Sequence, residues 1–162
     1  DIESGRVISH KVKYVNLDDP TFRDFKLEKG DILFNRTNSY ELVGRTGIFL
    51  LDGKYVFASY LIRLRVKKGM LDPHFLTFYM IYSGDRLRRM ASRAVHQANI
   101  NATNLKRFVI IVPPLQEQRK IVEMLNAIDE KLELLTRKKG RFEKIKRALM
   151  NDLLTGKRRV RI

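Results

Sequence analysis

Two polar stretches of this sequence carry side chains that could bind a nucleic acid. The first runs from Asn35 to Tyr40, and Arg45 follows it closely. Asparagine amides can bond the edge of adenine, arginine guanidinium groups the edge of guanine, and serine or threonine hydroxyls either a base or a phosphate. The candidate DNA-binding residues of this stretch are Asn35, Arg36, Thr37, Asn38, Ser39, Tyr40 and Arg45. In an alternative interpretation, Asn38 and Ser39 only form a turn.

The second stretch, Arg86 to Arg107, contains six basic residues and no acid. On a helix, Arg86, Arg89 and Arg93 would share one face. Together with Arg88, such a row suits phosphates, which fix the register of a protein on DNA without reading sequence. A loop behind this helix offers further side chains for base contacts: His96, Gln97, Asn99, Asn101 and Asn104. The alternative is a solvated basic face followed by an ordinary loop.

Catalytic and metal-binding patterns are missing from the sequence. His10, His74 and His96 are scattered without the spacing of metal ligands, no glycine loop completes a nucleotide fingerprint, and no serine lies in a nucleophile elbow. The chain has no cysteine, which excludes disulfides and thiolate metal sites. We therefore expect a non-catalytic chain with no metal and no cofactor of its own.

The charge predicts a polyanionic partner. The net charge is +15, of which residues 1–112 carry +8 (19 bases, 11 acids) and residues 113–162 carry +7 (14 bases, 7 acids). An excess in both parts favours nucleic acid over a membrane, although solubility alone is an alternative explanation. No apolar run is long enough to span a membrane and no signal peptide is present, so we expect a cytoplasmic protein.

The pattern of apolar residues predicts an α+β fold, with a small mixed-sheet domain and short helices over residues 1–112 and one long coiled-coil helix over 113–162. Turns are expected at Lys29-Gly30-Asp31 and, as a hairpin, at Asp52-Gly53. We expect loops over 16–24 and 95–104, and helices over 73–82 and 85–94. Strands are expected over 6–15, 32–34, 43 with 47–51, 55–66 (two strands) and 108–112.

The last part of the chain predicts a helix that pairs with another helix. After Pro113-Pro114, apolar residues recur at steps of four and three, with Lys139 and Lys146 at intervening positions. A period of about 3.5 residues held this long is typical of a coiled coil. Its acidic first half and basic second half favour antiparallel pairing; the alternative is a helix folded back on its own domain. The predicted pairing residues are Ile121, Leu125, Ile128, Leu132, Leu135, Phe142 and Leu149.

These residues also resemble a known family. Gln116 to Ile121 after Pro113-Pro114-Leu115, then Leu125 to Asp129 and Leu153 to Lys157, look like the C-terminal part of a type I restriction–modification specificity subunit. Three more segments are similar to the target-recognition domain of that family: Lys29 to Leu33, Val43-Gly44-Arg45, and Ile100-Asn101 leading through Leu105 into 109–112. The resemblance covers nearly the whole chain.

The resemblance implies a role in a larger complex. Such subunits carry two recognition domains, each reading half of a split site in double-stranded DNA, separated by two long antiparallel helices. The helices fix the spacing of the half-sites and dock methyltransferase (modification) subunits, which bind S-adenosylmethionine and flip the target adenine; the restriction subunit joins this complex. The specificity subunit itself is non-catalytic.

The chain departs from that pattern because it has one recognition domain and one helix. Asp1 to Gly5 resembles the middle of a recognition domain, so we expect the domain to lack its N-terminal strands and the chain to be a fragment or a self-pairing half-subunit. Two alternatives remain open. One is the recognition segment of a fused restriction–methyltransferase enzyme. Methyltransferases of that kind contain an Asn-Pro-Pro-Tyr box, and Pro113-Pro114 lacks the asparagine before it and the tyrosine after it. The other is a basic coiled-coil adaptor that does not distinguish DNA sequences.

Overall fold

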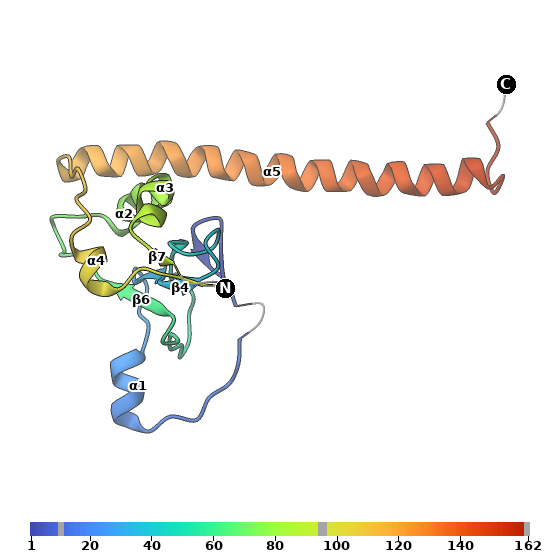
Figure 1. Cartoon of the computed structure of the whole chain (residues 1–162). Coiled ribbons are helices and arrows are strands. Elements are labelled where there is room, and N and C mark those ends of the chain that lie inside the picture. Colours follow the sequence, from blue (N-terminus) through green and yellow to red (C-terminus); the bar gives the residue numbers. More distant parts are fainter. Residues whose placement is uncertain (10–11, 94–96, 161–162) are drawn as a thin grey trace. The chain divides into compact units, whose positions relative to one another are not determined.

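The computed structural model of the chain describes residues 1–9, 12–93 and 97–160. The chain divides into two compact units, Asp1–Val122 and Glu123–Ile162. The first is an α+β unit with a small mixed sheet and short helices, and the second is part of the long helix α5 (Figure 1). The predicted fold class is therefore confirmed.

A five-stranded mixed sheet forms the centre of the first unit. Its strand order is β1 (Ile2–Glu3), β2 (Arg6–Val7), β5 (Thr46–Ile48), β3 (Ile32–Asn35) and β6 (Leu61–Leu64). β3 pairs antiparallel with β5 and with β6, whereas β2 runs parallel to β5. A Cβ on Gly47 would lie 3.1 Å from the carbonyl carbon of Arg6 in β2 and 2.8 Å from Ile2 Cγ2 in β1, which explains the glycine at this position.

All four residues of β3 are buried because the core lies on both faces of this strand. Side chains alternate across a strand. Ile32 and Phe34 accordingly belong to one cluster, with Leu76, Met80 and Leu87, while Leu33 belongs to a second cluster with Leu27 and Phe49. The strand predicted over 32–34 is confirmed as β3.

Helices cover one side of this core. α2 (Pro73–Tyr82) forms as predicted. Its N-cap is Asp72, whose Oδ1 accepts hydrogen bonds from the backbone N–H groups of His74 and Phe75 at 2.9 and 3.1 Å. α3 (Gly84–Arg89) follows directly and buries Leu87. α1 (Asp19–Phe25) has no buried residue, and α4 (Ala102–Lys106) buries Leu105.

The long helix is confirmed as α5 (Leu115–Leu154), 40 residues that continue through Gly140. Its first turns belong to the first unit because the side chain of Gln118 is 0% exposed. Gln118 Nε2 donates to the carbonyls of Met70 (3.0 Å) and Pro113 (2.8 Å), and its Oε1 accepts from the Asp72 N–H (2.8 Å). These three bonds tie the start of α5 to the first unit, which extends to Val122.

Two predictions near the N-terminus are wrong. The strand expected over 6–15 is limited to β2, and the loop expected over 16–24 contains the start of α1. Asp18 has an extended backbone and Pro20 stands in the first turn of α1, where a proline loses no helical hydrogen bond. Asp19-Pro20 therefore starts a helix instead of marking a loop.

Predictions for the segment after β3 are partly wrong. Within 43–51 the strand covers only β5, and Val43 lies in a buried turn. Only β6 forms within 55–66, where two strands were expected. Asp52-Gly53 does not close a hairpin because β5 and β6 pair with opposite edges of β3.

The segment before α5 also differs from prediction. The helix expected over 85–94 ends at Arg89, and the loop expected over 95–104 contains β8 (Ala98–Asn99) and the start of α4. No strand forms over 108–112. The Ile111 N–H donates to the Tyr79 hydroxyl at 3.3 Å, so its acceptor is a side chain and not the carbonyl of a neighbouring strand. No helix in the described part of the chain combines the length and apolar character of a membrane span.

Candidate nucleic-acid interface

A second, three-stranded sheet brings the two polar stretches together. It consists of β4 (Thr37–Asn38), β8 and β7 (Ser92–Arg93), with β8 in the middle and both pairings antiparallel. Thr37 lies opposite Asn99, and the Ile100 N–H extends the pairing by donating to the Arg36 carbonyl at 2.8 Å. Segments predicted separately from the sequence therefore form one surface element.

Side chains reinforce this sheet. Asn99 Nδ2 donates to the Thr37 hydroxyl at 2.8 Å, and the Ser92 hydroxyl donates to the Asn99 carbonyl at 3.1 Å. Thr37 and Asn99 thus hold the strands in register.

The turn interpretation holds for Ser39 but not for Asn38. Asn38 Oδ1 accepts from the Ser39 N–H at 2.8 Å, but Asn38 itself belongs to β4. The Ser39 carbonyl accepts from the N–H groups of Leu42 and Val43, so the turn begins at Ser39.

Asn35 and Arg36 contain buried polar atoms without a partner. Asn35 Oδ1 and Arg36 Nε make no hydrogen bond within the described residues, and Ser83 Oγ is a third such atom. An unpartnered buried polar group costs about 1–3 kcal/mol, so each calls for an explanation such as a water molecule or a ligand. Two of the three belong to consecutive residues of the predicted DNA-binding stretch.

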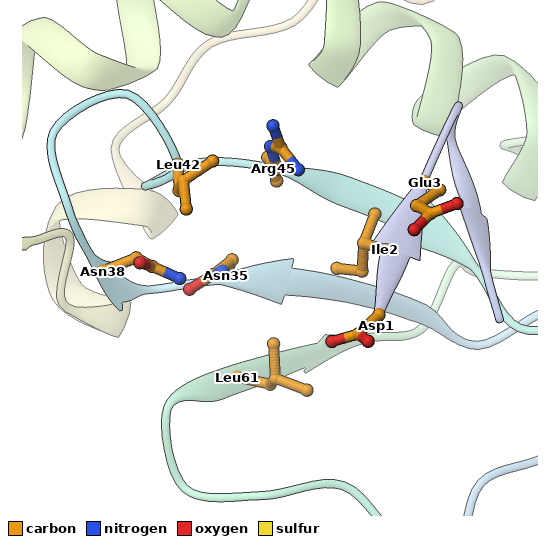
Figure 2. Close-up of a pocket in the computed structure, with 8 residues that line it drawn as sticks. All are labelled: Asp1, Ile2, Glu3, Asn35, Asn38, Leu42, Arg45 and Leu61. Carbon is orange, nitrogen blue, oxygen red and sulfur yellow. The ribbon is translucent and has the colours of Figure 1, made fainter. Parts of the chain in front are cut away.

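A cavity of about 180 Å³ adjoins Asn35. Figure 2 shows Asn35 at the end of β3 and Asn38 at the end of β4, with Arg45 on the opposite side, just before β5. Two backbone hydrogen bonds hold this arrangement: the Asn35 N–H donates to the Arg45 carbonyl, and the Gly44 N–H to the Asn35 carbonyl, both at 2.8 Å. The cavity is lined by Asp1, Ile2, Glu3, Asn35, Asn38, Leu42, Arg45 and Leu61.

The arginine row is arranged differently from the prediction. Arg86 and Arg89 are exposed on α3, and the Arg86 guanidinium lies 4.9 Å from the centre of the Phe108 ring. Arg88 forms an ion pair with Asp85. Because α3 ends at Arg89, Arg93 belongs to β7, opposite Ala98. The predicted helix face shared by Arg86, Arg89 and Arg93 is therefore wrong, and the arginines instead lie on two adjacent elements.

The remaining predicted residues take different positions. Gln97 is exposed beside β8. Asn101 caps α4, its Oδ1 accepting from the Asn104 N–H at 2.7 Å, which gives this side chain a structural role. Tyr40 is half-buried and packs against the core. His96 lies outside the described residues.

Glu41 is a residue of this surface that the sequence analysis did not select. It is exposed, and its pKa is lowered because the Glu41 N–H and the Ser39 hydroxyl donate hydrogen bonds to the carboxylate. A carboxylate can accept a hydrogen bond from the amino group of cytosine. The signal that could have found it was its place directly after the predicted stretch.

The second unit presents the predicted pairing surface. Leu125, Ile128, Leu132, Leu135, Phe142 and Leu149 are each at least 39% exposed. Ile121 is half-buried in the first unit. The six exposed side chains form an apolar row along one helix. Among the described residues, no group of three acidic or histidine side chains is placed to hold a metal ion.

Comparison with known sequences leads to the same family as the motifs described above. Residues 4–144 match the family described as the type I restriction modification DNA specificity domain. The putative type I restriction enzyme MjaX specificity subunit of Methanocaldococcus jannaschii is 30% identical over 160 residues, which are 95% of this chain and 37% of that relative. The EcoKI specificity subunit of Escherichia coli is 26% identical over 131 residues, 78% of this chain and 28% of the relative.

Solved structures share the fold. A chain from a structure of a type I R-M system, described for its complex assembly and conformational transition, superposes with a TM-score of 0.62 at 24% identity over 79% of this chain and 31% of that one. The HsdS subunit from Thermoanaerobacter tengcongensis gives 0.54 at 24% identity over 78% and 30%. This chain thus spans about a third of the length of these relatives.

Proposed function

This chain belongs to the family of type I restriction–modification specificity domains, and from that premise we propose that it reads one half of a split target site in double-stranded DNA. It does so without catalysing a reaction itself. The observation that carries the proposal is the β4–β8–β7 sheet, because it joins the two stretches whose side chains suit DNA.

Base reading is assigned to the residues around the cavity. Asn35, Asn38 and Arg45 offer amide and guanidinium groups, which match adenine and guanine edges. The unpartnered Oδ1 of Asn35, which lines the cavity, supports this assignment, since a bound ligand can satisfy a buried polar atom after a small local rearrangement. Ser39 and the exposed Glu41 follow Asn38 directly in the chain, and we assign them to base reading as well.

Phosphate binding is assigned to the arginines of α3 and β7. Arg86 and Arg89 are exposed, so their guanidinium groups are accessible to a DNA phosphate. Arg88 already holds Asp85, which reduces its availability. Arg93 continues the basic character onto β7, the strand that completes the sheet. Such contacts fix the register of the protein on DNA while the turn reads the bases.

The long helix provides assembly. We propose that its exposed apolar row packs against a second, antiparallel helix and that the pair docks methyltransferase subunits, which hold S-adenosylmethionine, with a restriction subunit joining through them. The exposed row supports the helix pairing. The family resemblance supports the remaining partners.

Selection from a randomised duplex pool tests the proposal. The chain is incubated with the pool alone and with a matching methyltransferase subunit, at two salt concentrations, and bound DNA is sequenced. We expect enrichment of a short motif, split into halves at fixed spacing when the methyltransferase is present. Salt-sensitive binding without enrichment in either sample would contradict the proposal and indicate a basic adaptor that does not distinguish sequences.

A further inference from the structure

The second half of α5 has a basic surface on the side away from its apolar row. An α-helix turns about 100° per residue, so Lys144, two residues after Phe142, lies on the opposite side from the row. We call the positions between residues 137 and 151 that lie within about 60° of Lys144 around the helix the outer face. Its members are Arg137, Gly140, Arg141, Lys144, Arg147, Ala148 and Asn151.

The outer face carries four basic residues and no acidic one. Arg137 forms an ion pair with Glu133, one turn earlier on the helix. Arg141, Lys144 and Arg147 are exposed, and within the described part of the chain none of the three forms an ion pair. Three neighbouring positive charges are therefore left uncompensated by the protein itself.

The acids of this half of the helix do not neutralise the outer face. Glu143 lies about 100° and Asp152 about 80° from Lys144 around the helix. Each also faces a base outside the outer face: Glu143 lies 3.9 Å from Lys139, and Asp152 lies 3.4 Å from Arg158. The outer face consequently keeps its positive charge over its whole length.

Gly140 leaves an open space between these basic side chains. A Cβ at this position would have no packing neighbour within 4 Å, and the backbone of Gly140 does not adopt the left-handed conformation that favours glycine. A glycine inside a helix costs about 1 kcal/mol relative to alanine, so neither packing nor backbone geometry explains it here. Glycine does permit a ligand to approach the backbone closely.

The composition of the outer face favours a nucleic acid over a protein partner. The face has no aromatic and no large apolar side chain, whereas the centres of protein interfaces are rich in aromatic residues and poor in lysine. The stretch from Arg137 to Arg147 is about 15 Å long, and over that length a DNA duplex carries about nine phosphate charges. A row of lysine and arginine suits such phosphates, whose contacts carry no sequence information.

We propose that the outer face of α5 binds the phosphates of double-stranded DNA independently of sequence, as a second DNA-binding surface besides the β4–β8–β7 sheet. Arg141, Lys144 and Arg147 supply the charge, and Gly140 permits the close approach of the DNA backbone. A helix packed on the apolar row leaves this face accessible because it lies on the opposite side. The inference rests on the proposed DNA reading and adds an affinity that does not depend on the target motif.

A salt series with matched variants tests the proposal. Binding of the full chain to a duplex of random sequence is measured by fluorescence anisotropy at several salt concentrations. In Arg141→Ala/Lys144→Ala/Arg147→Ala we expect the slope of the logarithm of affinity against the logarithm of salt concentration to decrease in magnitude by about three units. The control Lys13→Ala/Lys54→Ala/Lys68→Ala removes the same charge from exposed positions of the first unit and should keep the slope. Gly140→Gln should weaken binding without a change of charge, whereas Ala127→Gln, in the acidic half of α5, should not.

Three results would overturn the proposal. An unchanged slope in the triple outer-face variant would remove this face from the DNA footprint, and an equal decrease in the control would assign the effect to net charge alone. Loss of methyltransferase binding with an unchanged slope would identify an acidic protein surface as the partner.

Motif enrichment from the duplex pool separates this proposal from the proposed DNA reading. Enrichment should persist in the triple outer-face variant, because the residues assigned to base reading are intact. Its loss there would contradict the sequence independence of the outer face. If the unsubstituted chain enriches no motif while its salt slope still responds to the triple substitution, the base reading fails and the phosphate binding by α5 stands.

Discussion

The side-chain amide of Asn99 donates to the hydroxyl of Thr37 at 2.8 Å, although the two residues are 62 positions apart in the sequence. The bond joins β4 to β8, so that the turn after β3 and the segment before α4 form one surface. A side-chain bond between two short strands has a larger share of their stability than it would have in a long ladder. The DNA-reading surface proposed above depends on this pair.

Removing the hydroxyl of Thr37 tests that dependence. Thr37→Val keeps the shape of the side chain but deprives Asn99 Nδ2 of its acceptor. We expect the free energy of unfolding to fall by about 1 kcal/mol, and a cycle with Asn99→Ala to give a coupling of about 0.5–1.5 kcal/mol in urea denaturation. DNA affinity should fall in parallel. Thr103→Val, on the exposed face of α4, is the matched control. A coupling near zero would show that the Thr37–Asn99 hydrogen bond does not stabilise the sheet.

Salt dependence tests the phosphate contacts. Arg89 is exposed on α3, and its replacement by alanine should weaken binding to all DNA sequences alike. The slope of the logarithm of affinity against the logarithm of salt concentration should decrease in magnitude by about one unit. Lys54→Ala removes an exposed charge outside the proposed surface and should leave the slope unchanged. An unchanged slope in Arg89→Ala would exclude this residue from the footprint.

Gln118 should be one of the most sensitive residues for stability. Its fully buried side chain makes three hydrogen bonds to the backbone of Met70, Asp72 and Pro113. In Gln118→Ala all three backbone groups lose this partner, so the free energy of unfolding should fall by about 2–4 kcal/mol. Gln116→Ala, exposed two residues earlier, should change it by less than about 0.5 kcal/mol. Equal effects of the two substitutions in urea denaturation would contradict this role.

Asp31, which directly precedes β3, is held by three hydrogen bonds. Its carboxylate is 4% exposed and accepts from Arg65 Nε at 2.7 Å and Nη2 at 3.2 Å, and from the Glu28 N–H at 2.9 Å. Asp31→Ala should therefore lower the free energy of unfolding by about 2–4 kcal/mol. Glu28→Ala, which removes only a 3.5 Å contact between exposed side chains, should cost at most about 0.5 kcal/mol.

The pH dependence of this pair follows from the direction of the pKa shift. The hydrogen bond from Arg65 to Asp31 raises the pKa of the guanidinium. A cation with a raised folded-state pKa contributes stability at every pH below its unfolded pKa and loses it only as the pH rises through the folded value. We therefore expect the difference between the native chain and Asp31→Ala to stay constant from about pH 6 to 9, measured by urea denaturation at each pH.

The elements that the sequence predicted correctly are those with a local signal. The buried strand β3 is a continuous apolar run, α2 opens with Asp72-Pro73, and α5 repeats apolar residues over 40 residues. The two-residue strands β4, β7 and β8 have no such signal, because polar residues form them and only backbone pairing over long sequence distances defines them. Each half of the candidate surface was thus predictable, but their union was not.

Other differences have the same origin. The apolar residues 108–112 have a strand-like pattern, yet the Tyr79 hydroxyl takes up the Ile111 N–H. The spacing of Arg86, Arg89 and Arg93 suggested that they share one helix face. Met90 is the C-cap of α3, so the helix ends before Arg93. The burial of Gln118 could not be inferred from a polar residue in an amphipathic pattern, because its partners, Met70 and Asp72, lie more than 40 positions earlier.

The turn between β3 and β5 is closed at its base by the two backbone hydrogen bonds between Asn35 and the Gly44-Arg45 pair. These bonds involve only main-chain atoms, and Gly44 supplies the left-handed conformation (φ 84°) that the return of the chain requires. Of the residues between Asn35 and Gly44, Thr37 is tied to Asn99 and Tyr40 packs against the core, whereas Ser39 and Glu41 make no contact with that closure. Under the proposed DNA reading, Ser39 and Glu41 are the positions at which base preference can change while the sheet below keeps its structure.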